Sequence, residues 1–174
     1  AMAVAARQID PSLADAAVRL GEAFGAEDAQ ELLVDYTRLF LGPVDPRARP
    51  YGSTWLTGES TLMQDATMDA LELYREGGFE IDDTFRDLPD HVAVELEFLY
   101  VLAFRQHQAA QDGDAEARAA AEDLERRFLA RHLGAWVAPF TSAVHAGAET
   151  AFYRALAELT LAWLRQLDRD GALH

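Results

Sequence analysis

Apolar residues recur every three or four positions along most of the chain, and the strict alternation typical of strands is absent. This spacing places apolar side chains on one face of successive α-helices. It predicts helices over about 11–25, 27–41, 60–75, 90–110, 115–132 and 149–168, with another after Gly134. We therefore expect an all-α fold, built as a single-domain bundle of roughly seven to eight helices.

Capping and breaking residues set the expected ends of the first two helices. Pro11 and Ser12 begin the first helix, and Asp15 follows Ser12 at the spacing of a capping box. The pair Gly42-Pro43 ends the second, because proline cannot continue a helix.

A long loop rich in proline and glycine is expected over residues 41–59. Loops of this length inside a compact domain are uncommon and are often functional. This one carries Tyr51 and Trp55, and large aromatic side chains on a stiff loop make good binding anchors. The alternative is that both rings fold back onto the helices.

The helix at about 90–110 is apolar almost all round, whereas a surface helix has a polar half. We therefore expect it to run through the middle of the protein. It nevertheless carries Asp90, His91, Glu95 and Glu97 near its start. Buried charge is costly unless it is paired, so these side chains are candidates for a functional site.

Composition narrows the classes of function. Half of the 174 residues are hydrophobic, which excludes a disordered chain, and the absence of cysteine excludes disulfides, thiolate metal sites and cysteine catalysis. No run of eighteen apolar residues and no basic-then-apolar leader is present, so we expect a cytoplasmic protein without a membrane span or signal peptide.

The net charge of −15 argues against a nucleic-acid partner, which such a surface repels. It favours a cationic partner, although acidity can also serve solubility alone.

His91 and Glu95 are four residues apart and share one helical face. One alternative is therefore a small helical metal-dependent enzyme that uses His91 and Glu95 together with Asp90. A di-iron bundle needs Glu-x-x-His pairs, and none occurs. Gly-x-Ser-x-Gly, P-loop and Gly-x-Gly-x-x-Gly motifs are also missing. We expect no catalytic residue, no bound metal and no cofactor. A purely structural interpretation is that Asp90 caps the helix and His91 is a satisfied core residue. A second functional alternative is a generic helical adaptor that binds an amphipathic helix.

Four segments in order resemble the TorD/DmsD family of molybdoenzyme maturation chaperones. They are Tyr36-x-x-Leu39-Phe40-x-Gly42-Pro43; Pro50-Tyr51-Gly52-Ser53 with Trp55; Leu88-Pro89-Asp90-His91 followed by Glu95-Leu96-Glu97-Phe98; and His132-Leu133-x-x-Trp136-x-x-Pro139-Phe140 followed by Phe152-Tyr153-x-x-Leu156-Ala157. The resemblance covers about residues 30–165 and implies an all-helical chaperone domain at 3–170.

The resemblance also implies a function. Such a protein binds the twin-arginine leader and the apo-form of a DMSO-reductase-family catalytic subunit, and holds that subunit until cofactor insertion and before export. The expected partners are therefore a leader peptide and an apo-enzyme, without integral membrane association. We expect a monomer or a domain-swapped dimer.

By position, the resemblance places Tyr51, Trp55, Asp90 and His91 in or beside the leader-binding pocket. Glu95 and Phe98 lie on the same helical face as His91 and complete the expected peptide-binding set. We predict that the aromatic loop meets the start of the central helix. In that pocket Asp90 would face an arginine of the leader, and Glu95 would orient His91.

Overall fold

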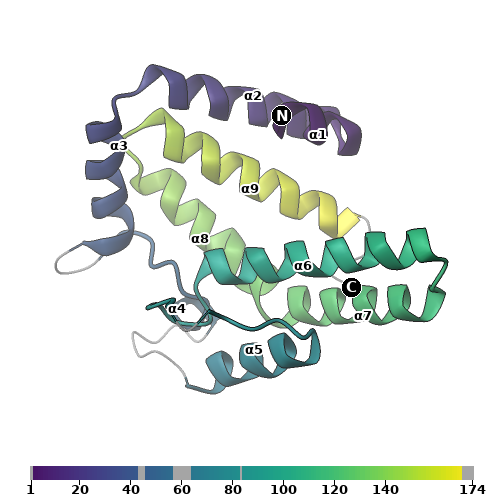
Figure 1. Ribbon diagram of the computed structural model, residues 1–174. Helices are drawn as coiled ribbons and strands as arrows, with labels where there is room; N and C mark the ends of the chain where they lie inside the picture. The colour runs from purple at the N-terminus through teal and green to yellow at the C-terminus, as the bar shows by residue number, and fades with distance from the viewer. Residues whose placement is uncertain (1, 43–45, 57–63, 83, 170–174) are drawn as a thin grey trace. The chain divides into compact units, whose positions relative to one another are not determined.

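The computed structural model describes residues 2–42, 46–56, 64–82 and 84–169 (Figure 1). Its helices are α1 (Met2–Ile9), α2 (Pro11–Ala26), α3 (Ala29–Tyr36), the π-helix η1 (Thr37–Leu41), α4 (Ser53–Leu56), α5 (Gln64–Glu76), α6 (Val92–Asp112), α7 (Ala115–Arg131), α8 (Leu133–Gly147) and α9 (Ala151–Arg169). Within these ranges no strand forms, apart from one isolated β-bridge. The predicted all-α fold is confirmed. None of the described helices is both long enough and apolar enough to cross a membrane.

The N-terminal region differs from the prediction in two ways. Helix α1 was not expected, and the cap of α2 is Asp10, whose carboxylate accepts a 2.7 Å hydrogen bond from Ser12 N. Pro11 occupies the start of the helix, so the capping residue is the one before it. The expected capping box of Ser12 and Asp15 is therefore wrong.

The predicted loop at 41–59 contains the single helical turn of α4. Residues 43–45 and 57–59 of this loop lie outside the described residues, as do residues 60–63 of the helix predicted at 60–75. From Gln64 onward that helix is present as α5. Pro139 lies inside α8.

The chain forms two compact units, and the boundary between them falls within α8. One unit holds the residues up to Pro50 and from Val137 onward. In it, α2 packs against both α1 and α9, and Figure 1 shows these helices side by side. The face of α2 toward this contact is made of small and aliphatic side chains, namely Leu13, Ala14, Ala16, Ala17 and Leu20.

Asp35 joins two helices of this first unit. Its side chain is buried, and Oδ2 accepts hydrogen bonds from Glu149 N, Thr150 N and Thr150 Oγ1 at 3.0, 2.8 and 2.7 Å. Oδ1 accepts a 2.6 Å bond from Arg38 Nη2. The carboxylate thereby ties α3 to the segment that begins α9.

The other unit runs from Tyr51 to Trp136. Helices α6 and α7 form a hairpin that turns at Gly113, which adopts a positive φ of 70° and closes α6. Helix α5 packs against α7. Aromatic rings fill the core: Phe98 lies 4.8 Å from Tyr74 and 4.9 Å from Phe128, centroid to centroid.

Helix α6 is buried on one face only. Leu96, Tyr100 and Phe104, spaced four residues apart, are 37%, 69% and 51% exposed. The expectation that this helix runs through the middle of the protein is therefore wrong, because apolar composition does not show how many neighbours a helix has. The helix also begins two residues later than expected, at Val92, and its N-cap is His91, so the alternative in which Asp90 caps α6 is wrong as well.

Candidate functional site

The aromatic loop and the start of α6 lie together in the second unit. Tyr51 and His91 form an antiparallel β-bridge, and their rings meet edge to face at 5.4 Å. Next to them, Gly52 N donates a 2.9 Å hydrogen bond to Asp90 O. The predicted meeting of these two segments is confirmed.

Asp90 has a structural task in this arrangement. Its carboxyl group is 1% exposed, and Oδ2 accepts a 2.9 Å hydrogen bond from Ser53 N, the first amide of α4. From α5, Tyr74 donates its hydroxyl to Pro89 O at 2.9 Å and fixes the preceding peptide. Asp90 therefore holds the aromatic segment onto α6 and is not presented at the surface as an open anion.

Glu95 is also buried, and it bonds to a residue that the sequence did not suggest. Its Oε2 accepts a 2.9 Å hydrogen bond from Trp136 Nε1. Burial raises the pKa of Glu95 well above its ordinary value, the nearby charge of Asp90 adds to this, and the Trp136 bond opposes it.

His91 does not bond to Glu95. Its Nδ1 accepts a 3.1 Å hydrogen bond from Ala93 N, as an N-cap does. Burial lowers the pKa of His91, against the opposing charges of Asp87 and Asp90. The expectation that Glu95 orients His91 is wrong, because the cap turns the imidazole toward the backbone while Glu95 turns inward.

The six residues predicted for peptide binding thus fall into two groups. Tyr51, Trp55 and His91 are partly exposed, whereas Asp90, Glu95 and Phe98 are buried beneath them. Phe98 belongs to the aromatic core of this unit. In this structure a partner can reach the first group, and the second supports it.

The arrangement gives the metal-enzyme alternative no support. His91 and Glu95 point to different partners, and the described residues contain no group of three or more His, Cys, Asp or Glu side chains that could hold an ion.

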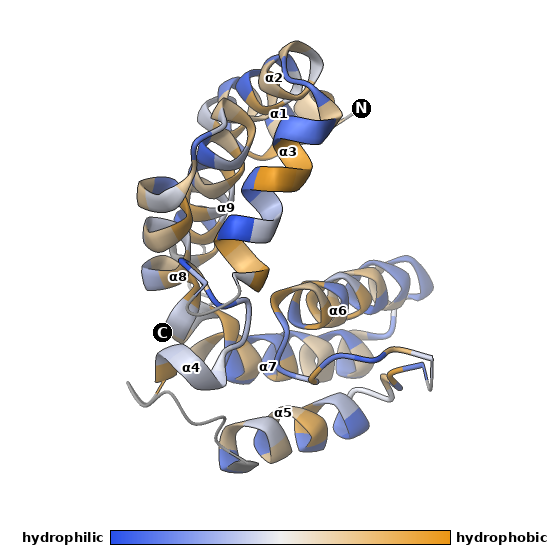
Figure 2. Ribbon diagram, turned by 90° about the vertical axis from the view of Figure 1, so that its left-hand side faces the viewer, coloured by the Kyte–Doolittle hydropathy of each residue, from blue (hydrophilic) through white to orange (hydrophobic). Residues whose placement is uncertain are grey.

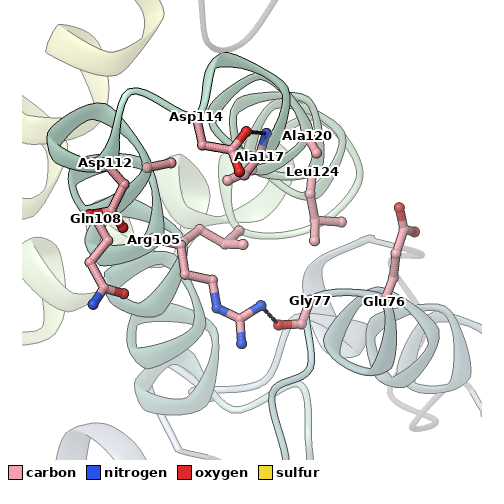
Figure 3. A pocket seen from close by; sticks show the side chains of 12 residues that line it. Glu76, Gly77, Arg105, Gln108, Asp112, Asp114, Ala117, Ala120 and Leu124 are labelled. Carbon is pink, nitrogen blue, oxygen red and sulfur yellow. Dashed lines mark hydrogen bonds between the residues drawn. The ribbon is translucent and has the colours of Figure 1, made fainter.

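Another hollow of this unit, about 550 Å³ in volume, lies among α6, α7 and the end of α5. Figure 3 shows Arg105 reaching across it toward Gly77, whose carbonyl accepts from the guanidinium. Arg105 also donates to Gly78 O at 3.3 Å. The guanidinium thus holds the turn after α5, and much of the remaining lining is alanine.

Sequence reasoning missed two buried residues that complete the site. Trp136 is fully buried and donates to Oε2 of Glu95, and Tyr74 carries the hydroxyl that donates to Pro89 O. Burial raises the pKa of Tyr74, and the charges of Glu95 and Asp90 raise it further. Trp136 lies in one of the motifs that resemble the TorD/DmsD family, but no spacing rule links it to Glu95, which is 41 residues away.

Comparisons with known proteins identify the family. Residues 6–142 match the family model described as nitrate reductase delta subunit. The chaperone protein TorD of Vibrio parahaemolyticus is 32% identical over 156 residues, 88% of this chain and 69% of that protein. The TorD of Photobacterium profundum is 36% identical over 82% of this chain and 64% of its own length, and that of Vibrio atlanticus is 30% identical over 88% and 69%.

The chain belongs to the TorD family. The resemblance inferred from the motifs is thereby confirmed, and with it the role of a chaperone in molybdoenzyme maturation. Because these relatives are named chaperones, the prediction that the protein is not an enzyme is also confirmed. The alignments cover 64% to 69% of the length of these relatives.

The buried Glu95 predicts a pH dependence of stability. A carboxyl group whose pKa is raised on folding stabilises the folded state fully below its unfolded value, 4.5, and this contribution is lost as pH rises. Glu95→Gln should therefore gain stability relative to wild type as pH rises from about 5 to about 8. Urea denaturation across this range measures the difference. Glu97→Gln, at an exposed neighbouring position, is the control. If the free energy of unfolding changes with pH in the same way for wild type and Glu95→Gln, the raised pKa of Glu95 is contradicted.

Proposed function

We propose that this TorD-family protein is a cytoplasmic chaperone that binds the twin-arginine leader and the apo-form of a DMSO-reductase-family catalytic subunit. It holds that subunit until the molybdenum cofactor is inserted and before export. Such a leader joins a pair of arginines to an apolar segment. A protein that binds it must offer carboxylates or aromatic faces to guanidinium groups, and apolar side chains to the rest.

One observation carries the proposal. Large apolar side chains remain exposed on well-formed helices of a protein whose net charge is −15, among them Leu96, Tyr100 and Phe104 on α6. A monomeric surface rarely leaves such rows uncovered unless they bind something. Near the start of the same helix, Tyr51, Trp55 and His91 add partly exposed rings. We propose that these three contact the client, supported from beneath by Asp90, Glu95 and Phe98.

A synthetic leader peptide, titrated into the full chain by calorimetry, tests this function. We expect binding that weakens as salt rises, because charges more than about 10 Å apart are screened at 0.1 M salt. Trp55→Ala should weaken binding about tenfold, the loss typical of an aromatic hot spot.

The control is Glu122→Ala, which removes an exposed carboxylate that pairs only with its own helix neighbour Arg118 among the described residues. This variant should bind as wild type does. Absence of peptide binding to wild type would contradict the proposed function. Capture of the client from the native host, identified by mass spectrometry, would name the catalytic subunit.

A further inference from the structure

Helix α3 in the first unit buries its charge and exposes its apolar side chains. Asp35 is its one fully buried residue, whereas Leu33 and Val34 are 57% and 53% exposed. Tyr36 and, at the end of η1, Leu41 are 39% and 61% exposed. Figure 2 shows this hydrophobic colouring along α3. An amphipathic helix normally turns its apolar stripe inward, but none of the residues that the structure describes covers this outward face.

An acidic hollow of about 350 Å³ adjoins this face. It is lined by Glu27, Gln30, Glu31, Val34, Asp35, Glu149 and Thr150. Val34 belongs to both the hollow and the apolar face, so the two surfaces are continuous. We call them together the α3 surface.

The carboxylates of the hollow differ in how they are engaged. Glu27 accepts from Ala151 N and Phe152 N, and Asp35 accepts from Glu149 N and Thr150 N, so both are used in the fold. Glu149 is 69% exposed and pairs at 3.1 Å with Arg38. Glu31 is exposed, and its carboxylate makes no hydrogen bond or ion pair with the described residues. Glu31 and Glu149 can therefore accept a further cation.

The backbone beside this surface is unusual as well. Directly after α3 the chain continues as the π-helix η1, closed by a 2.8 Å bond from Gly42 N to Thr37 O. Such short π-helical segments are rare, and they are found frequently at functional sites.

We propose that the α3 surface docks the arginine-bearing, apolar segment of the client leader, an inference that rests on the proposed function. A guanidinium group of the leader lies in the hollow between Glu31 and Glu149, and the apolar residues that follow it cover Leu33, Val34 and Leu41. Charge complementarity selects this occupant: carboxylates beside exposed aliphatic side chains match a cation that precedes an apolar run.

Other occupants fit less well. A second copy of this chain, related by a two-fold axis, would bring the same carboxylates face to face, and nucleic acid would be repelled. The row of Leu96, Tyr100 and Phe104 on α6 is also apolar. Glu97 is the one carboxylate among the exposed α6 positions from 93 to 104. This row therefore matches the apolar part of a leader better than it matches the leader's arginines.

The test uses the full chain and a fluorescein-labelled peptide that carries two adjacent arginines followed by an apolar segment. Binding is followed by fluorescence anisotropy at low and high salt. Leu33→Gln/Val34→Gln should raise Kd about tenfold or more. Glu31→Gln/Glu149→Gln should weaken binding at low salt and remove most of its salt dependence. A peptide with lysines in place of the arginines should bind wild type more weakly, because lysine lacks the bidentate fork.

Two further variants make the same chemical changes elsewhere. Tyr100→Gln/Phe104→Gln tests the exposed apolar row of α6 as the competing docking surface, and Glu116→Gln/Glu122→Gln, at exposed acids of α7, is the matched control that should bind as wild type does. All four substituted side chains of the α3 surface are exposed, and circular dichroism together with urea denaturation verifies that each variant folds.

The outcomes separate the two proposals. If wild type binds the peptide and both α3-surface variants bind equally well, docking on α3 is overturned while the proposed function stands. Loss of binding only in the α6 variant likewise places the peptide on α6 and overturns this inference. If wild type does not bind the peptide at all, the proposed function and the docking surface both fail.

Discussion

Asp35→Ala should lower the free energy of unfolding by about 3 kcal/mol or more, the cost of removing one partner from a buried charged network. The carboxylate is 2% exposed and accepts four hydrogen bonds. Alanine would leave the amides of Glu149 and Thr150 without their acceptor at the start of α9. Urea denaturation followed by circular dichroism measures the loss.

The pH dependence of this effect has a definite sign. Burial alone would raise the pKa of Asp35, but hydrogen bonds from Thr150, Arg38 and Glu149 N outweigh it and lower the pKa below 3.8. A depressed acid pKa stabilises the folded state above the unfolded value, and this stability is lost as pH falls. The difference in the free energy of unfolding between wild type and Asp35→Ala should therefore become smaller below about pH 4.

Asp35→Asn is the matched variant, because it keeps one acceptor oxygen and the side-chain volume. It should lose less stability than alanine does. If Asp35→Ala unfolds at the same urea concentration as wild type, the hydrogen bonds to the start of α9 do not stabilise this unit. Asp15→Ala on the exposed side of α2 provides the surface baseline.

The helices could be predicted because local signals specify them. Spacing of apolar residues, together with Gly42, Gly77-Gly78 and Gly113, located most helix bodies to within a few residues. The signals that failed were also local. Pro11 moved the cap of α2 to Asp10, and His91 took the cap of α6, since either residue type can supply an acceptor next to a helix start.

Which face of a helix is covered could not be predicted. The same periodicity that identifies α3 would assign its apolar side inward, yet Leu33 and Val34 are exposed and Asp35 is buried. Burial is decided by the neighbours that tertiary structure supplies. Here those neighbours are the amides before α9, more than a hundred residues away in sequence, and they favour a carboxylate over an aliphatic side chain.

The candidate site was predictable as a location but not as a network. Tyr51 and Asp90-His91 stood out as aromatic and polar exceptions in plain helical sequence, and they do lie together. The partners of each group depend on hydrogen-bond geometry that sequence spacing does not encode. Asp90 bonds to Ser53 N and Glu95 to Trp136, so the two carboxyls organise the site from beneath.

Asp90 is not the group expected to bind a cationic partner. A buried carboxyl that already holds α4 can meet a guanidinium group only if the aromatic segment first moves, whereas Glu31 and Glu149 are exposed in the folded protein. Weakened leader binding in Asp90→Ala would therefore reflect loss of the Tyr51–Leu56 segment, and stability measurements on the same variant separate the two causes.

Gly52→Val should destabilise the second unit by about 3 kcal/mol, at the upper end of the cost of overpacking a core. Even a Cβ atom at this position would lie 2.8 Å from Trp136 Nε1 and 3.1 Å from Glu95 Oε1, and both side chains are fully buried. The backbone cannot retreat, because Gly52 N donates to Asp90 O while Gly52 O accepts from Trp55 N and Leu56 N. Gly52→Ala should also lower the free energy of unfolding, by a smaller amount.

Gly21→Ala is the matched control for this last prediction. Gly21 lies within α2, and a Cβ atom added there meets nothing within 4 Å. Alanine there should stabilise the protein by roughly 0.5–1 kcal/mol, because glycine loses more conformational freedom in a helix. Opposite signs at the two glycines, measured by urea denaturation, would establish that Gly52 is required for space beside Trp136. A neutral Gly52→Val would show instead that Trp136 and Glu95 can separate, and that the segment carrying Tyr51 and Trp55 is not fixed by them.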